Sequence, residues 1–132
     1  MFVDTSVIVS ILSGEAGSAE LAQRIEAAPS NITSALVVLE AVMQLSTKLA
    51  IEPLEVEAAV AAFLAEARME IVPIGSAAAQ LAVRAFSDYG KGRGHPAQLN
   101  LADCLSYACA KEHGTLLLYK GDDFSRTDIE AA

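Results

Sequence analysis

The sequence predicts an α/β domain in which a short parallel sheet is covered by helices on both faces. Segments typical of strands and segments typical of helices alternate along the chain. The predicted strands are short and continuously apolar, which is typical of parallel strands that are buried on both faces. The chain has 132 residues, the size of one ordinary domain, and 53% of them are apolar, enough for one hydrophobic core. We therefore expect a single domain that spans residues 1–132.

The first half of the chain is predicted to contain two of the strands. These are Met1–Val3 and Asn31–Ser34, which are short and bounded by polar residues. Apolar residues at helical spacing predict four helices. The first contains Val7, Ile8, Ile11 and Leu12, and the second covers Ser18–Ala28 and ends at Pro29. The third covers Ala35–Leu49, and the fourth begins at Pro53. The last helix carries a stripe that faces the core and consists of Val56, Val60, Phe63, Leu64 and Ala67.

The second half continues the alternation. A third strand is predicted at Glu70–Ile74 and a fourth at Thr115–Tyr119, with a fifth, short edge strand near Ile129. The remaining predicted elements are a helix that Ser76 caps and that runs to about Phe86, a loop over Ser87–Leu99, a helix over Leu101–Glu112 that Gly114 stops, and a turn over Lys120–Phe124.

The net charge limits how the chain can bind nucleic acid. Nine basic and 17 acidic residues give a formal charge of −8, whereas proteins that hold phosphate by bulk electrostatics carry an excess of Lys and Arg. If this chain acts on nucleic acid, a bound divalent cation is the expected means of attracting the phosphate.

The cysteines and the N-terminal residues predict a cytoplasmic protein. Cys104 and Cys109 form no CxxC pair and are expected to be small buried apolar residues in a reducing compartment. Asp4 interrupts the first apolar run and no basic region precedes it, so no signal peptide is expected. No uncharged run approaches the roughly 18 apolar residues that a membrane helix needs.

Acidic residues follow two of the predicted strands. Asp4 comes directly after the first strand, and Asp122 and Asp123 come after the fourth. Because the carboxyl ends of parallel strands meet at one edge of a sheet, these side chains are expected near one another. The structural alternatives are that Asp4 caps the first helix and that the aspartate pair lies in a solvated turn.

Two further carboxylates lie in apolar helices. Glu40 is the only charged residue between Asn31 and Lys48, in a helix that is apolar on every side and is therefore expected to be buried. Burying a carboxylate is costly unless it is paired or bound to a metal. Its alternative is a narrow exposed stripe beside Gln44. Asp103 is similarly isolated, although an N-cap at Asn100 would explain it equally well.

Together these acidic positions indicate a metal site. Clustered carboxylates repel one another unless a cation neutralises them. A set of ligands made only of oxygen atoms favours Mg²⁺ or Mn²⁺ over zinc. Such ions bind substrate phosphates and activate water for in-line attack.

Four segments of the chain resemble one family. They are similar to those of a PIN-domain ribonuclease of the VapC toxin type, in the same order and over nearly the whole chain. The four segments are Met1–Ser6, the Leu39-Glu40 helix, Asn100–Ala108 and Leu117–Asp128. The resemblance implies a three-layer α/β/α PIN-like fold with a short central parallel sheet.

The resemblance also implies an activity and partners. The family's proteins are Mg²⁺- or Mn²⁺-dependent endoribonucleases of type II toxin–antitoxin systems, which cut RNA, often tRNA or rRNA. A cognate VapB-like antitoxin neutralises them. We expect the same of this chain, and we expect a homodimer.

The site residues carry over by motif. Asp4, Glu40 and Asp103 correspond to acids of the metal site, and Thr5 or Ser6 is expected to orient one of these ligands. The fourth acid falls within Gly121-Asp-Asp-Phe124, so that both Asp122 and Asp123 are candidates.

The Tyr89–Pro96 loop precedes the predicted Asp103 helix. Its Lys91, Arg93 and His95 are candidates for contacts with the RNA backbone, and the alternative is a flexible solvated loop. The loop matches neither a Walker motif nor a dinucleotide-binding GxGxxG motif after a strand.

The residues of this chain do not match the patterns of two other families whose first strand ends in an acidic residue. A haloacid-dehalogenase-like phosphotransferase requires a second Asp two residues after the first, where this chain has Ser6. A response-regulator receiver requires an Asp in mid-chain, and none lies between Asp4 and Asp88. A catalytically silent PIN-like binding subunit that acts through protein partners remains the alternative.

Overall fold

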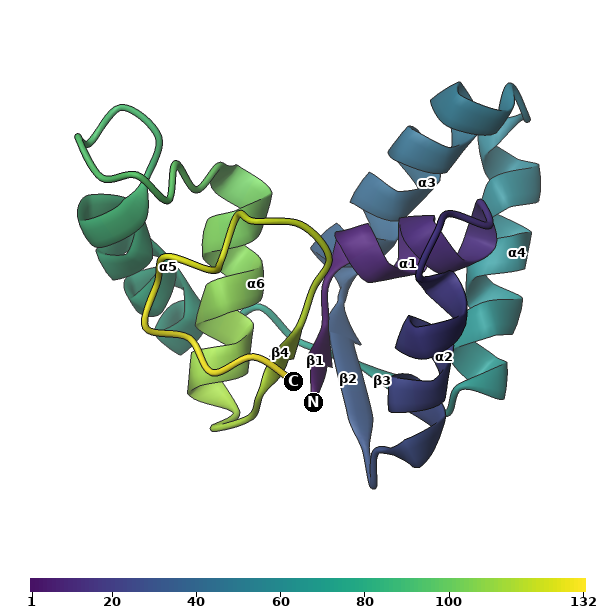
Figure 1. The fold of residues 1–132 in the computed structure, drawn as a ribbon, viewed down its shortest axis with the longest axis horizontal. Coiled ribbons are helices and arrows are strands. Elements are labelled where there is room, and N and C mark those ends of the chain that lie inside the picture. The colour runs from purple at the N-terminus through teal and green to yellow at the C-terminus, as the bar shows by residue number, and fades with distance from the viewer.

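The computed structural model describes residues 1–132 and has a four-stranded sheet at its centre (Figure 1). The strands lie in the order β3-β2-β1-β4, and every neighbouring pair is parallel. Their bounds are Phe2–Val3 for β1, Asn31–Ser34 for β2, Met69–Val72 for β3 and Leu117–Leu118 for β4. The prediction of a short parallel sheet is confirmed.

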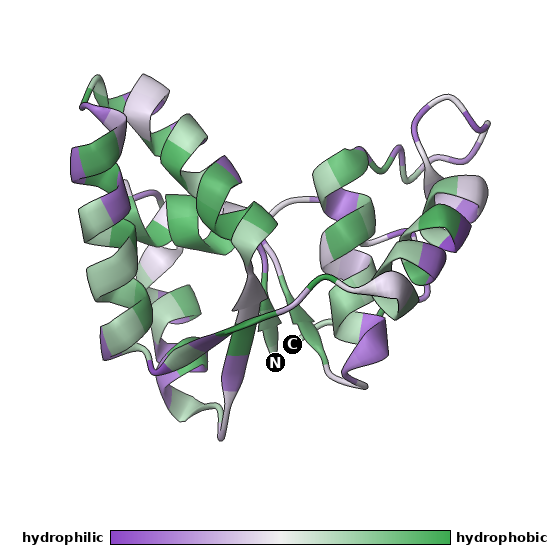
Figure 2. Cartoon of the chain, turned by 180° about the vertical axis from the view of Figure 1, so that it is seen from behind, coloured by the Kyte–Doolittle hydropathy of each residue, from purple (hydrophilic) through white to green (hydrophobic).

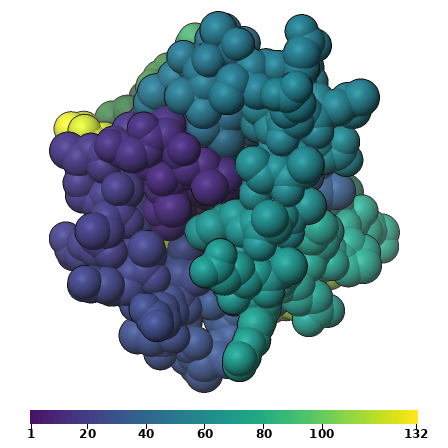
Figure 3. Space-filling model, turned by 90° about the vertical axis from the view of Figure 1, so that its right-hand side faces the viewer, coloured from purple at the N-terminus to yellow at the C-terminus, as the bar shows by residue number.

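Six helices cover the two faces of this sheet. They are α1 (Thr5–Leu12), α2 (Ser18–Ala27), α3 (Ala35–Leu49), α4 (Pro53–Glu66), α5 (Ser76–Tyr89) and α6 (Leu101–Glu112). Helices α1 to α4 lie on one side of the sheet, and α5 and α6 lie on the other (Figure 1). Figure 3 views the first of these layers from outside, where the purple, blue and teal residues of α1 to α4 form most of the surface. The fold is therefore the expected three-layer α/β/α arrangement.

Local sequence explains where several helices begin. The Ser34 hydroxyl accepts a hydrogen bond from the Val37 amide at 3.3 Å and so caps α3. Pro53 occupies the first turn of α4, where its missing N–H leaves no hydrogen bond unmade. Asn100 and Asp103 form a reciprocal capping box at the start of α6.

Several predicted boundaries in the second half of the chain are wrong. Gly75, and not Ser76, is the N-cap of α5, and this helix continues to Tyr89, so the following loop begins at Gly90. Strand β3 starts at Met69 and ends before Pro73, because proline has no N–H to donate to a neighbouring strand.

The predicted fifth strand near Ile129 is not formed. Only an isolated parallel bridge joins Ala131 to Leu117. It consists of the hydrogen bonds from the Leu117 amide to the Glu130 carbonyl and from the Ala132 amide to the Leu117 carbonyl, both at 2.9 Å. One bridge is too short for a strand, although it does cover the outer edge of β4.

The core surrounds the two shortest strands. Both residues of β1 and both of β4 are buried, and helices on each face pack against them. Cys104 and Cys109 are buried and free, as expected. None of the helices has the length and apolar character that crossing a membrane would require.

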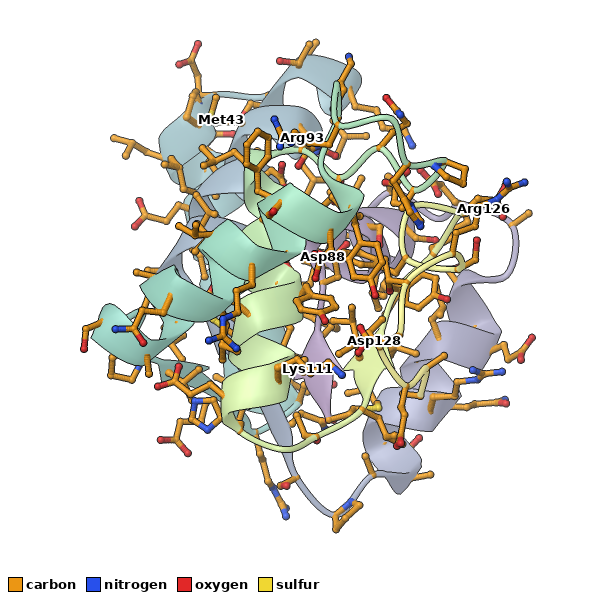
Figure 4. All side chains as sticks on the ribbon, turned by 90° about the vertical axis from the view of Figure 1, so that its left-hand side faces the viewer. Met43, Asp88, Arg93, Lys111, Arg126 and Asp128 are labelled. Atoms are coloured by element: carbon orange, nitrogen blue, oxygen red, sulfur yellow. The ribbon has the colours of Figure 1, made fainter.

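Helix α3 differs from its prediction. It was expected to be buried on every side, but Leu39 is 56% exposed and Met43 is 61% exposed. Figure 2 shows how apolar this helix and its neighbour α4 are along their length, and Met43 is labelled in Figure 4. Only the face of α3 that carries Val37, Ala41 and Leu45 is buried.

Candidate active site

Asp4 lies between β1 and α1, at the carboxyl end of the sheet, and is 6% exposed. Its Oδ2 accepts hydrogen bonds from the Ser6 amide at 3.0 Å and from the Ser6 hydroxyl at 2.7 Å, so Asp4 is the N-cap of α1. Its Oδ1 accepts a hydrogen bond from the Ser106 hydroxyl of α6 at 2.7 Å. The capping interpretation is therefore correct for Oδ2, and the second oxygen faces the opposite helix layer.

Asp103 lies in the first turn of α6 and is 7% exposed. One oxygen accepts the Asn100 amide at 3.0 Å, and its own amide donates to the Asn100 side chain at 2.9 Å. Burial raises the pKa of Asp103 to about 7; the Asn100 hydrogen bond opposes this rise, and the charges of Asp123, Asp4 and Glu40 add to it. The capping role is thus present, together with a strongly perturbed carboxylate.

Glu40 reaches the same region from α3, where it is partly buried. Burial raises its pKa, and the charge of Asp4 adds to this effect. The Thr5 hydroxyl favours the charged form of Glu40, yet it makes no hydrogen bond of ordinary geometry and is buried without a partner. Lys48 does not neutralise Glu40, because it pairs with Glu15 instead.

The two candidates for the fourth acid make different contacts. Both side chains are exposed, and the charge of Asp123 contributes to the raised pKa of Asp103. Asp122 contributes its carbonyl oxygen, which accepts the Ser125 amide at 3.2 Å and the Ser125 hydroxyl at 2.7 Å and so closes the turn. Asp123 therefore belongs to the carboxylate cluster, which we define as Asp4, Glu40, Asp103 and Asp123.

The carboxylate cluster fits a divalent cation by the chemistry of its donors. All four side chains offer oxygen, none forms an ion pair with Lys or Arg, and the buried Thr5 Oγ1 lacks a partner beside them. The side chains do not already close around one point, because no three acidic, His or Cys residues are arranged as ligands of one ion. Side-chain movements would be needed to bring three of these oxygen atoms onto one ion.

The raised pKa of Asp103 leads to a prediction about stability. Because its pKa is about 7 in the folded protein and 3.8 in the reference state, the folded state retains the proton longer. The contribution of protonated Asp103 to the free energy of unfolding is therefore fully present below the pKa of the unfolded chain. It is lost as the pH rises from 3.8 towards 7. Asp103→Asn removes the charge but keeps an oxygen for the Asn100 amide. In chelator at pH 8, we expect Asp103→Asn to be about 1 kcal/mol more stable than wild type, with little gain at pH 4.

Thermal melts in chelator, Mg²⁺ and Mn²⁺ would measure this effect. A cation that binds the native state stabilises it, so wild type should gain from either metal and Asp103→Asn should gain little. A variant that melts below wild type in chelator and gains as much from metal would show that Asp103 acts as a capping residue alone.

The sequence patterns did not predict two residues that make hydrogen bonds at the site. Ser106 contacts Asp4, and it lies one helical turn after Asp103 in an apolar stretch, a spacing that places both on one face of α6. Lys120 is the second. Its amide donates to the Ser6 hydroxyl at 3.0 Å, and its ammonium donates to Ser10 and Glu15. It ties the turn that carries Asp123 to α1, and no spacing rule indicates this contact.

The loop between α5 and α6 is closed by its own hydrogen bonds. The Lys91 amide donates to the Leu99 carbonyl at 2.9 Å, and the ring of His95 accepts the Ala97 amide at 3.0 Å. Arg93 lies 5.8 Å from the centre of the Phe86 ring, at the end of the molecule towards which the strands point (Figures 1 and 4). Lys91 and Arg93 are exposed without an ion pair, whereas His95 supports the loop itself.

The chain is similar in sequence to known proteins over nearly its whole length. A VapC ribonuclease of Mycobacterium bovis is 42% identical over 134 residues, covering 100% of this chain and 98% of the relative. A VapC ribonuclease of Rhizobium meliloti is 44% identical over 140 residues, covering 97% of this chain and 98% of the relative.

Solved structures share the fold. VapC20 of Mycobacterium tuberculosis, described as a toxin that cleaves the sarcin–ricin loop, has a TM-score of 0.74 at 19% identity, over 99% of this chain and 97% of that chain. A toxin–antitoxin complex from Klebsiella pneumoniae has a TM-score of 0.68 at 21% identity, over 96% of this chain and 92% of that chain. The family model of the PIN domain matches residues 1–130. The chain therefore belongs to the PIN-domain family, among its VapC-type members.

Proposed function

We propose that this chain is an endoribonuclease that depends on Mg²⁺ or Mn²⁺ and acts as the toxin of a type II toxin–antitoxin pair. The observation that carries the proposal is the carboxylate cluster, in which four acids from four separate parts of the chain share one region without a basic partner. Such an arrangement is unfavourable for stability, so a functional reason is expected. The relatives that carry the name VapC ribonuclease support this reason.

In the proposed reaction, the protein binds and orients the reacting groups. The carboxylate cluster supplies oxygen ligands, and Ser6 fixes Asp4 in position through two hydrogen bonds. A bound Mg²⁺ or Mn²⁺ supplies charge for the phosphate and lowers the pKa of water. Because Asp103 binds a proton up to a pH of about 7, cation binding would displace that proton and would strengthen as the pH rises.

The proposed partners follow from the same role. RNA, with tRNA or rRNA as the expected target, is the substrate, and a cognate VapB-like antitoxin inhibits the enzyme. The Klebsiella pneumoniae neighbour, whose structure is a toxin–antitoxin complex, supports the antitoxin. We also propose that the protein acts in the cytoplasm as a homodimer.

Lys91 and Arg93 are proposed to contact the RNA backbone. Replacing both with alanine should weaken RNA binding and lower the salt dependence by roughly one unit of slope for each lost phosphate contact. Binding to RNA at several salt concentrations measures this slope. Arg68→Ala is the matched control, because Arg68 is also exposed without an ion pair but precedes β3, at the other end of the sheet. An unchanged slope in the double variant would show that the loop does not bind RNA.

The proposed activity is tested by mapping RNA ends after induced expression. New ends at defined sites, absent when Asp4→Asn is expressed, are the expected result. Purified wild type should cut the same RNA in Mg²⁺ or Mn²⁺ and not in chelator. The alternative, a catalytically silent subunit that binds protein partners, predicts no new ends and no cleavage under either condition.

A further inference from the structure

Asp4 accepts hydrogen bonds through both of its carboxylate oxygens, and the donors of the two oxygens lie in different helix layers. Ser6 binds Oδ2 from α1, whereas the Ser106 hydroxyl binds Oδ1 from α6 at 2.7 Å. Ser106 is 2% exposed, and its contact with Asp4 joins residues 102 positions apart in the chain. The contact therefore crosses the sheet edge and connects the two layers at the carboxylate cluster.

Helix α6 also carries Asp103, one turn before Ser106. Residues three positions apart lie on one face of a helix, so α6 presents a carboxylate and a hydroxyl donor to the same region. The capping box fixes Asp103 to the start of the helix. As a result, one rigid element sets the position of Asp103 and, through Ser106, the position of Asp4.

The local environment gives no other reason for a hydroxyl at this position. Ser106 is surrounded along the helix by buried residues of apolar character, including Cys104, Ala108 and Cys109. Alanine would favour the helix more than serine does, and it would bury no polar group. The Ser106 hydroxyl donates to Asp4 and forms no other side-chain hydrogen bond in the structure.

We propose that Ser106 is a positioning residue of the site, which aims Asp4 Oδ1 at the cation and fixes its separation from Asp103. This inference rests on the proposed function, because it needs Asp4 to be a metal ligand. An ionised carboxylate oxygen has room for two acceptor contacts, so the hydrogen bond from Ser106 leaves Oδ1 able to bind an ion. Partners of metal ligands act in this way, and their loss typically weakens metal binding by about 10- to 100-fold.

The test measures binding of Mn²⁺ to metal-free protein, without RNA, from the electron paramagnetic resonance signal of the free ion. We expect Ser106→Ala to weaken Mn²⁺ binding by about 10- to 100-fold, and we expect excess Mn²⁺ to restore RNA cleavage. Ser46→Ala is the matched control, because the Ser46 hydroxyl bonds to a carbonyl of its own helix α3. Unchanged Mn²⁺ affinity in Ser106→Ala, with or without a lower melting temperature in chelator, would overturn the inference.

Two further variants separate hydrogen bonding from packing. Ser106→Thr keeps the hydroxyl and should bind Mn²⁺ more tightly than Ser106→Ala does. In Ser106→Cys the side chain is nearly the size of serine, but the thiol is a weaker hydrogen-bond donor. If the alanine variant unfolds, the Mn²⁺ affinity of the cysteine variant is compared with that of wild type instead. Equal Mn²⁺ affinity of the cysteine variant and wild type would then reject the role of the hydrogen bond.

Asp4→Asn distinguishes failure of this inference from failure of the proposed function. If wild type binds Mn²⁺, Asp4→Asn does not, and Ser106→Ala binds as wild type does, only the role of Ser106 is rejected. If wild type and Asp4→Asn bind Mn²⁺ equally, Asp4 is not a ligand, and both the metal site and the inference are rejected.

Discussion

Replacing Asp4 or Asp103 with asparagine is expected to lower the rate of RNA cleavage by about a thousandfold, because loss of a charged metal ligand removes several kcal/mol of transition-state stabilisation. Asparagine keeps the size of each side chain and retains an oxygen for the hydrogen bonds from Ser6 or Asn100, and at position 4 its NH2 group can donate to the Ser106 hydroxyl. The fold should therefore be intact, as circular dichroism would check. Cleavage at the wild-type rate by both folded variants would reject the metal site.

The adjacent aspartates provide an internal control for this experiment. Asp123→Asn should lower the cleavage rate, because its charge acts on Asp103, whereas Asp122→Asn should cut RNA nearly as wild type does. Both side chains are exposed and both changes remove one charge from the same turn. A reversed result, with loss only in Asp122→Asn, would transfer the fourth position of the cluster to Asp122.

Phe124→Ala is expected to destabilise the protein by about 3–5 kcal/mol, the usual cost of removing a buried phenylalanine side chain. Phe124 is 1% exposed, and its ring centre lies 5.1 Å from that of Tyr119. A domain of this size has a total stability of about 5–15 kcal/mol, so the loss is a large fraction of it. Unfolding in urea would measure the change.

The matched variant for this position is Phe124→Leu, which keeps most of the volume and should cost less than about 1.5 kcal/mol. Where the loss in Phe124→Ala unfolds part of the protein, apparent Mn²⁺ affinity should fall in proportion to the fraction that is still folded. A change in unfolding free energy below about 1 kcal/mol for Phe124→Ala would mean that the turn is not anchored through this ring.

Helices that combine a regular apolar pattern with a capping residue could be predicted to the residue. Ala35–Leu49 and Leu101–Glu112 have the bounds that their sequences predict, because Ser34 and Asn100 supply caps within the same segment. The strands were less predictable. Pairing with neighbours far away in sequence decides where β1 and β4 end, and each has only two residues.

The apolar pattern of α3 correctly predicted a helix and wrongly predicted burial on all sides. Hydrophobicity shows that a surface is costly to hydrate, but it does not show whether the same chain covers that surface. Leu39 and Met43 are apolar and remain exposed, because no other part of this chain covers them.

The sequence predicted the acidic candidates, and Thr5 or Ser6 as a residue that orients one of them, but it did not predict the contacts of Ser106 and Lys120. Strand order and helix position were enough to bring Asp4, Glu40 and Asp103 together. The choice between Asp122 and Asp123 depended on the path of one turn, and the role of Ser106 depended on a partner 102 residues away.

The pairing of β1 with β4 has a consequence for the protein during its synthesis. Phe2 is aligned with Leu117, so the strand that precedes Asp4 gains its neighbour β4 only after Leu117 and Leu118 have been made. Asp103 and Asp123 also belong to the final third of the sequence. A contact between such distant segments forms late in folding, because closure of the long intervening loop must come first. A growing chain that has not yet reached these residues thus lacks two of the four carboxylates of the cluster, so the proposed metal site cannot form before they are made.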